Sequence, residues 1–155
     1  NPQRTAQVLA LVELSRRITS KPLVRGQPIR CCEDVAAAYG PRLSSSQQEV
    51  FVAISLDAQN RVIAEHELFR GSLTGVEVHP RELFHQLIRD GAVAALLLHN
   101  HPSSDPTPSS EGHVLCHRLC NAGSLLGIVV VDFVILAGEE YTSFQERGYM
   151  PEVQP

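Results

Sequence analysis

The sequence predicts an α/β domain in which a mixed sheet is flanked by helices. Short runs rich in Val, Ile, Leu and Phe have the length and composition of strands, and they alternate with segments whose apolar residues recur at helical spacing. The 155 residues are enough for one domain that buries about two-thirds of its unfolded surface. An apolar content of 43% and a charged content of 19% exclude a disordered or fibrous chain.

Residues 1–30 are predicted to form a helix and a linker. Apolar residues recur at helical spacing over residues 5–19, so an amphipathic helix is expected there. Proline and glycine residues indicate that 21–30 is a connector. The predicted domain then covers residues 31–150, followed by a short tail over 151–155.

The next elements are a short helix and a β-hairpin. The helix is expected over residues 33–39 and should end at Gly40-Pro41. Residues 49–56 are rich in Val, Ile and Phe, which is typical of a strand. Turn-forming residues 57–60 separate this run from a second predicted strand over 61–69, so the two form a hairpin.

A third short strand over residues 76–78 and another helix are predicted next. Pro80 is favourable at the first position of a helix, and Gly91 is expected to close it. Four apolar residues mark the inner face of this helix: Leu83, Phe84, Leu87 and Ile88.

The last third of the domain is predicted to contain three strands and one helix. The run over residues 94–98 is short and is followed by prolines, which favours a buried strand. Ser109 is a good N-cap for a helix that is expected to end near Gly123. Strands are predicted over residues 128–136 and 141–143.

Two histidines follow the predicted strand over residues 94–98. Side chains two positions apart on an extended backbone share a face, so His99 and His101 can reach one ion while Asn100 points away. The start of the next helix, at Ser109, can supply a further group. Since catalytic zinc usually takes three protein ligands and one water, the arrangement is a candidate metal site.

The motif His99-Asn100-His101-Pro102, followed by Asp105-Pro106-Thr107-Pro108-Ser109, resembles the signature of bacterial RadC-type (UPF0758) proteins. These proteins belong to the JAMM (MPN-type) metallopeptidase superfamily, and the similarity extends from about Ala6 to Tyr149. Further matching groups are Glu49-Val50-Phe51, Phe69-Arg70-Gly71-Ser72-Leu73, Val78-His79-Pro80-Arg81-Glu82-Leu83-Phe84, Gly127-Ile128 and Tyr141-Thr142-Ser143-Phe144-Gln145-Glu146-Arg147-Gly148. The resemblance implies the JAMM/MPN fold, with a cytidine-deaminase-like α/β arrangement.

The resemblance also implies a zinc metallopeptidase, a hydrolase of amide or isopeptide bonds. In JAMM enzymes zinc polarises a water, a strand glutamate is general base and acid, and a serine supports the oxyanion. The matching residues here are His99 and His101 as metal ligands, Glu49 as acid and base, and Ser109 as helper. Each assignment has a simpler alternative. The two histidines can be exposed to solvent without binding metal, Glu49 can be a solvated residue at a strand edge, and Ser109 can act only as a helix N-cap. Asp105 is expected to be a turn residue.

One position departs from the superfamily pattern. The third metal ligand is an Asp eleven residues after the second histidine, and this position is Gly112 here. Glu111 or His113 can replace it, although each lies about 100° around the helix. Alternatively, two histidines and waters hold zinc weakly, or no metal binds. Structural zinc sites bind the metal with a free energy of roughly 10–16 kcal/mol, and the loss of one ligand removes several kcal/mol of it. Poor zinc occupancy is therefore expected.

A second group of metal-binding residue types lies on the helix after Ser109. His113, Cys116, His117 and Cys120 form one helical stripe, but one helix cannot surround a tetrahedral ion, so ordinary packing is favoured. Cys116 lies one turn beyond the glycine of the missing ligand and is a distant candidate substitute. RadC-type sequences commonly have Asp-His where this chain has Asp132-Phe133, a difference to which no role is given.

Cysteine usage and charge limit the partners. The four cysteines lack the spacing of a disulfide framework, so free thiols and a cytoplasmic location are expected. No apolar run is long enough to cross a bilayer.

The net charge of −4 divides into +5 for residues 1–30 and −9 for the remainder. The acidic body argues against nucleic acid, and 1–30 is more simply a solvated linker helix than a nucleic-acid contact.

Three functions remain open from the sequence. The first is a JAMM hydrolase acting on a protein or peptide, rescued by a substitute ligand. The second is a catalytically inactive MPN module that binds a protein tail beside a degenerate site. The third is a DNA-repair-associated protein that binds nucleic acid through residues 1–30.

Overall fold

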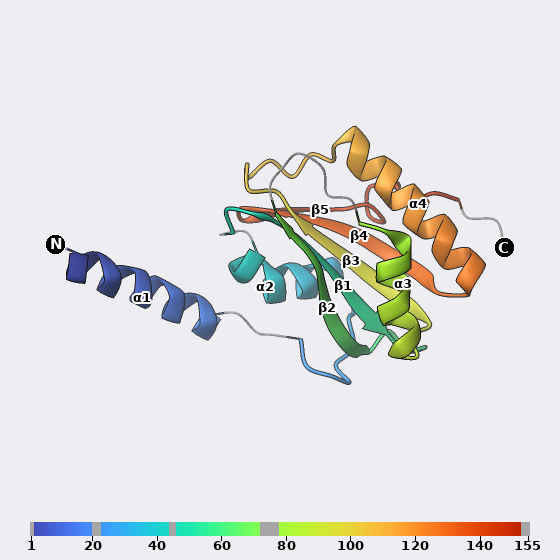
Figure 1. Cartoon of the computed structure of the whole chain (residues 1–155), viewed down its shortest axis with the longest axis horizontal. Coiled ribbons are helices and arrows are strands. Elements are labelled where there is room, and N and C mark those ends of the chain that lie inside the picture. The colour runs from blue at the N-terminus through green and yellow to red at the C-terminus, as the bar shows by residue number, and fades with distance from the viewer. Residues whose placement is uncertain (1, 20–22, 44–45, 72–77, 153–155) are drawn as a thin grey trace.

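The computed structural model describes the chain except for residues 1, 20–22, 44–45, 72–77 and 153–155 (Figure 1). Nine helices and strands lie in the described part, in the order α1 (Pro2–Thr19), α2 (Cys32–Leu43), β1 (Glu49–Leu56), β2 (Val62–Gly71), α3 (Pro80–Arg89), β3 (Ala94–Asn100), α4 (Ser110–Leu126), β4 (Val129–Ala137) and β5 (Glu140–Ser143). The predicted hairpin and the strands predicted over residues 94–98, 128–136 and 141–143 are confirmed, with bounds that differ by at most two residues. Among the described residues, no helix combines the length and apolar character needed to cross a bilayer.

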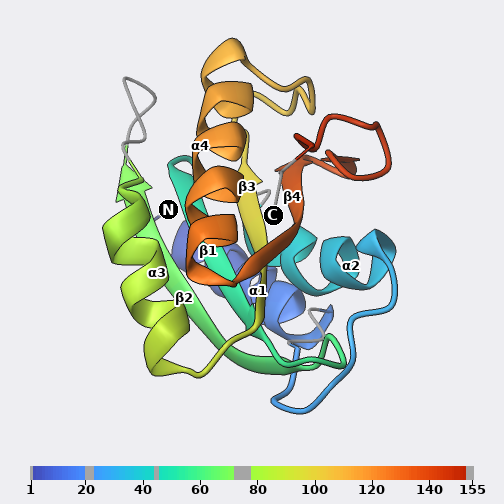
Figure 2. The ribbon, with the colours of Figure 1, turned by 90° about the vertical axis from the view of Figure 1, so that its right-hand side faces the viewer.

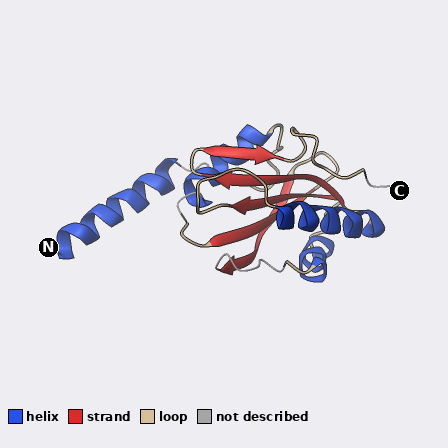
Figure 3. Ribbon diagram, turned by 90° about the horizontal axis from the view of Figure 1, so that it is seen from above, coloured by secondary structure: helices blue, strands red, loops and turns tan. Residues whose placement is uncertain are grey.

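The five strands form one mixed sheet in the order β2-β1-β3-β4-β5, which confirms the predicted fold class. β3 and β4 are parallel, and the other neighbouring pairs are antiparallel. Helices α3 and α4 cover one face and α2 covers the other (Figures 2 and 3). Because β1 and β3 lie between two helical layers, every residue of both strands is buried, which explains their continuous apolar runs.

Helix α1 extends away from this layered body (Figure 1). The predicted helix forms, but the five large aliphatic side chains that are described in it do not enter the core. Their exposed fractions lie between 51% and 65%: Val8, Leu9, Leu11, Val12 and Leu14.

Three predicted details of the fold are wrong or lie outside the described residues. Helix α2 does not end at Gly40-Pro41 but continues to Leu43, whose side chain is buried and whose carbonyl accepts a hydrogen bond from Asn100. A proline in the last turn removes only one backbone donor, and the tertiary contacts of Leu43 outweigh this loss. Ile88 is 56% exposed rather than on the inner face of α3. Of the predicted strand over 76–78, residues 76 and 77 are not described, and Val78 lies in no strand.

The fourth difference concerns Gly123, where α4 was expected to end. The helix instead runs to Leu126 and is capped by Gly127, whose φ of 70° is the left-handed conformation that glycine adopts easily. Gly123 lies within the helix because the chain returns closely against it. A Cβ at this position would overlap the carbonyl oxygen of Ile128 and would lie 3.3 Å from the ring of Phe84.

We therefore expect Gly123→Ala to lower the free energy of unfolding by about 2–4 kcal/mol, because the backbone of Ile128 must move to admit the methyl group. Urea denaturation measures this loss. Gly40→Ala is the matched control, since a Cβ at Gly40 in α2 meets nothing within 4 Å. That control should change the free energy of unfolding by less than about 1 kcal/mol, since the helix propensity gained by alanine is offset by its position before Pro41. Equal changes in the free energy of unfolding for Gly123→Ala and Gly40→Ala would contradict the close approach of Ile128 to Gly123.

Candidate functional site

The two histidines of the predicted metal site lie at the end of β3, which extends to Asn100 rather than stopping at residue 98. Their rings approach each other, with centroids 5.1 Å apart and planes at 84°. His99 is buried, whereas His101 is partly exposed. The alternation expected of an extended strand thus brings both imidazoles to the same face.

The hydrogen bonds of the two rings determine which nitrogen carries the proton. Nδ1 of His99 lies 3.3 Å from the carbonyl oxygen of Val50, and Nδ1 of His101 lies 2.8 Å from that of Asp105. A carbonyl only accepts, so Nδ1 is the donor in both rings. In its neutral form, each imidazole therefore has its lone pair on Nε2, as metal ligation or proton transfer requires.

Glu49 joins this pair from the first residue of β1. Its Oε2 lies 3.7 Å from Nε2 of His99, and its side chain is almost completely enclosed. Burial raises the pKa of the Glu49 carboxyl, and the positive charge of a protonated His101 opposes this shift. Burial, with a smaller contribution from His101, lowers the pKa of His99 to about 4. His99 is thus neutral at pH 7, and its contact with Glu49 is not an ion pair.

Ser109 and Asp105 shape the loop that leads from the histidines to α4. Ser109 is the N-cap of the helix, and its Oγ accepts a hydrogen bond from the N–H of Gly112 at 3.0 Å. Oδ1 of Asp105 accepts from the N–H of Thr107 at 2.9 Å, which confirms that Asp105 is a turn residue. The N-cap prediction for Ser109 is also confirmed, and its catalytic role stays a prediction.

Position 112 has room for the side chain that this chain lacks. A Cβ built on Gly112 would meet only Oγ of Ser109, at 3.4 Å, which is ordinary van der Waals contact. A Cβ is therefore tolerated at this position, and the glycine is not required by close packing.

The two candidate substitutes for the missing ligand make other contacts. Glu111 accepts a hydrogen bond from the Ser110 hydroxyl at 3.0 Å and is exposed to solvent. The ring of His113 packs against Phe144 and Tyr149, with centroid distances of 5.0 and 5.1 Å. Among the described residues, no three His, Cys, Asp or Glu side chains converge as a metal site.

The residues present therefore do not complete the zinc site that the fold family implies. His99 and His101 offer two nitrogen ligands, and Glu49 lies beside them in the place of an acid or base. The third protein ligand has no counterpart among the described residues. The arrangement suits weak capture of a cation or polar recognition better than tight zinc binding.

The stripe of metal-binding residue types on α4 is divided between core and surface. Cys116 and Cys120 are buried, whereas His117 is exposed. Cys116 contacts sulfur atoms of Cys120 and Met150, so it packs in the core and is not a substitute ligand for the histidines. All four cysteines are free, as predicted.

Asn100 makes hydrogen bonds to the backbone beside Glu49, and the sequence did not reveal this role. Its Oδ1 accepts from the N–H of Val50 at 2.6 Å, and its Nδ2 donates to the carbonyls of Leu43 and Gln48, each at 3.1 Å. These bonds secure the backbone on both sides of Glu49. The only sequence signal was a carboxamide placed between two histidines, on the opposite face of a buried strand.

Asp132 is a second polar residue whose role emerges from the structure. Its Oδ2 accepts from the Cys32 thiol at 3.0 Å and from the Ser143 hydroxyl at 2.6 Å, and its Oδ1 accepts two backbone N–H groups. The carboxylate thus ties α2 and the end of β5 to β4. Phe133, which replaces the histidine common in RadC-type sequences, packs between the rings of Phe51 and Phe144.

Comparison with known proteins adds to this geometry. A family model described as a RadC-like JAB domain matches residues 29–149. A UPF0758 protein of Desulforamulus reducens is 42% identical over 147 residues, or 95% of this chain and 65% of that protein. UPF0758 proteins of Syntrophotalea carbinolica and Geobacillus kaustophilus are 39% and 40% identical, each over 96% of this chain and 66% of their own length. The chain thus spans slightly less than two-thirds of these curated relatives.

Proposed function

The chain belongs to the RadC-like JAB domain family, and from this premise we propose that it is a JAMM-type module that binds a protein or peptide segment without efficiently hydrolysing it. The segment would lie beside the cluster of Glu49, His99 and His101. The observation that carries the proposal is the glycine at position 112, together with the other contacts made by Glu111 and His113. A tight zinc site needs a third protein ligand, and these contacts supply none.

The remaining polar groups suit recognition of a peptide backbone. The two Nε2 atoms are hydrogen-bond acceptors for amide N–H groups, and the buried Glu49 carboxyl is a further polar partner. Partly enclosed polar groups of this kind gain more from a hydrogen bond than fully solvated ones do. Recognition therefore does not require the metal that the superfamily uses for hydrolysis.

Zinc-dependent hydrolysis of amide or isopeptide bonds is the second candidate. It is favoured by the retained carboxylate 3.7 Å from His99 and by the proton on Nδ1 of both rings. Two protein ligands would hold the metal loosely, so the reaction would depend on a high zinc concentration.

Zinc titration of the purified chain tests the proposal. We expect zinc to bind weakly, to be removed by dialysis against a chelator, and to lose its remaining affinity in His99→Ala. Isothermal titration calorimetry and metal analysis after dialysis measure both properties. Stoichiometric zinc that survives dialysis would contradict the incomplete site and favour the hydrolase.

A defined library of linear and isopeptide-linked peptides tests the binding role. Peptides retained by the domain should be recovered intact by mass spectrometry, with or without added zinc, and retention should fall in Glu49→Gln and His101→Ala. Retention that is unchanged in both variants would place binding elsewhere, and cleaved peptides would indicate a working enzyme.

A further inference from the structure

Three sulfur atoms meet where α4 packs against the segment that follows β5. Sγ of Cys116 lies 3.9 Å from Sγ of Cys120 and 3.9 Å from Sδ of Met150. The two cysteines are one helical turn apart, and the methionine approaches from the C-terminal side of the domain. We refer to Cys116, Cys120 and Met150 as the sulfur cluster.

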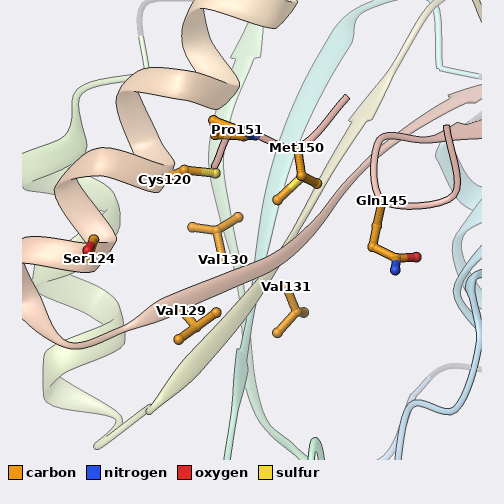
Figure 4. Close-up of a pocket in the computed structure, with 8 residues that line it drawn as sticks. All are labelled: Cys120, Ser124, Val129, Val130, Val131, Gln145, Met150 and Pro151. Atoms are coloured by element: carbon orange, nitrogen blue, oxygen red, sulfur yellow. The ribbon is translucent and has the colours of Figure 1, made fainter. Parts of the chain in front are cut away.

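The sulfur cluster adjoins a cavity of about 500 Å³ between α4, β4 and residues 145–151 (Figure 4). Figure 4 shows the sulfur of Cys120 directed from α4 toward the side of the cavity where Met150 and Pro151 lie. Cys116 is fully buried and Cys120 is 4% exposed, whereas Met150 is partly exposed. The described residues that line the cavity are all uncharged: Cys120, Ser124, Val129, Val130, Val131, Gln145, Met150 and Pro151. Two of the three residues of the sulfur cluster, Cys120 and Met150, thus line the cavity, whereas Cys116 does not.

We propose that the sulfur cluster is a binding site for a soft monovalent cation, Cu(I). Thiolate and thioether sulfurs are the donors that select Cu(I), whereas a thioether is a poor ligand for the harder divalent ions. With metal–sulfur bonds of about 2.3 Å, three sulfurs at the corners of a trigonal site lie about 4.0 Å apart. The distances from Sγ of Cys116 to Sγ of Cys120 and to Sδ of Met150, each 3.9 Å, match this spacing.

Binding releases a proton from each thiol, because the thiolate and not the thiol is the metal ligand. Both protons pass to solvent as the two thiolate–copper bonds form, and copper stays in the Cu(I) state. Two thiolates and one neutral thioether then give the ion three sulfur donors, all from the sulfur cluster.

The site is separate from the histidine pair of β3. Cys116 and Cys120 belong to the core beneath α4, whereas Glu49, His99 and His101 lie where β1 begins and β3 ends. Binding at the sulfur cluster therefore needs none of the residues of the proposed peptide site. The two proposals can fail independently.

Anaerobic titration of the 155-residue chain with Cu(I), in competition with a chromophoric Cu(I) chelator, tests this site. We expect one equivalent to be retained and the affinity to fall at least about 100-fold in Cys120→Ala, because one of the two thiolate ligands is lost. Met150→Leu keeps the volume and removes one sulfur, so a fall of about 10-fold or more is expected. Cys31→Ser, at an exposed thiol, and His99→Ala should bind Cu(I) like the unaltered chain.

X-ray absorption of the Cu(I)-loaded protein provides a second measurement that does not depend on Cys120→Ala folding. The unaltered chain should show three sulfur neighbours and Met150→Leu should show two. No retained Cu(I), an affinity that is lost in Cys31→Ser, or nitrogen neighbours in place of sulfur would overturn the proposal. Thermal unfolding monitored by circular dichroism identifies any variant that is not folded.

Discussion

Gly112→Asp is expected to raise the affinity for zinc by about three orders of magnitude. The substitution supplies a carboxylate at the third ligand position, where a Cβ meets only Oγ of Ser109 at 3.4 Å. The two imidazoles already carry their protons on Nδ1, so no rearrangement of the rings is needed. A third protein ligand is worth several kcal/mol, and each 1.4 kcal/mol corresponds to about a tenfold change in affinity. Calorimetric titration with zinc measures the gain.

Ser110→Asp is the matched control for this substitution. It places the same charge in the first turn of α4 but about 160° around the helix from position 112. Both variants should gain stability from a negative charge near the helix N-terminus, about 0.3–1 kcal/mol, so this effect does not distinguish them. Only Gly112→Asp should bind zinc tightly. Equal zinc affinities in both variants would show that more than one ligand has been lost from the site.

Asn100→Ala is expected to lower the free energy of unfolding by about 3–5 kcal/mol. The side chain of Asn100 is fully buried and makes hydrogen bonds to the backbone of Leu43, Gln48 and Val50. Removing the carboxamide leaves one backbone N–H and two carbonyls without this partner, at about 1–3 kcal/mol for each group that stays buried and unpaired. Urea denaturation followed by circular dichroism measures the change.

Asn100→Leu separates hydrogen bonding from volume, since leucine fills the space but pairs with none of these groups. Asn121→Ala, at an exposed position on α4, controls for loss of a carboxamide and should change stability by less than about 0.5 kcal/mol. We expect Asn100→Leu to be about as unstable as Asn100→Ala. Recovery of most of the stability by leucine would show that Asn100 acts mainly by filling space.

The location of the site could be predicted from the sequence because its signals are local. The two-residue period of a strand places His99 and His101 on one face, and the N-cap preference of serine places Ser109 at the start of α4. The apolar runs identified β1, β3 and β4 for the same reason, since the pattern of side chains along a strand is set by its own backbone. The missing side chain at Gly112 was also visible directly.

The orientation and burial of the side chains around the site depend on contacts between parts of the chain that are distant in sequence. The orientation of His113 follows from packing against Phe144 and Tyr149, more than thirty residues away, and no local period contains that information. The buried roles of Asn100 and Asp132 likewise depend on partners up to 57 and 100 residues away in sequence. The position of Gly123 within α4 follows from the return of the chain at Ile128.

The sequence by itself determined where the five strands of the sheet lie and which face the two histidines share, and the family resemblance singled out Gly112. Only the tertiary structure showed that the described His, Cys, Asp and Glu residues form no group of three for a metal, that Asn100 secures both sides of Glu49, and that three sulfurs meet beneath α4. The physical reason is that backbone geometry and capping act over a few residues. The pairing of buried polar groups and the packing of side chains are determined when elements far apart in sequence come together.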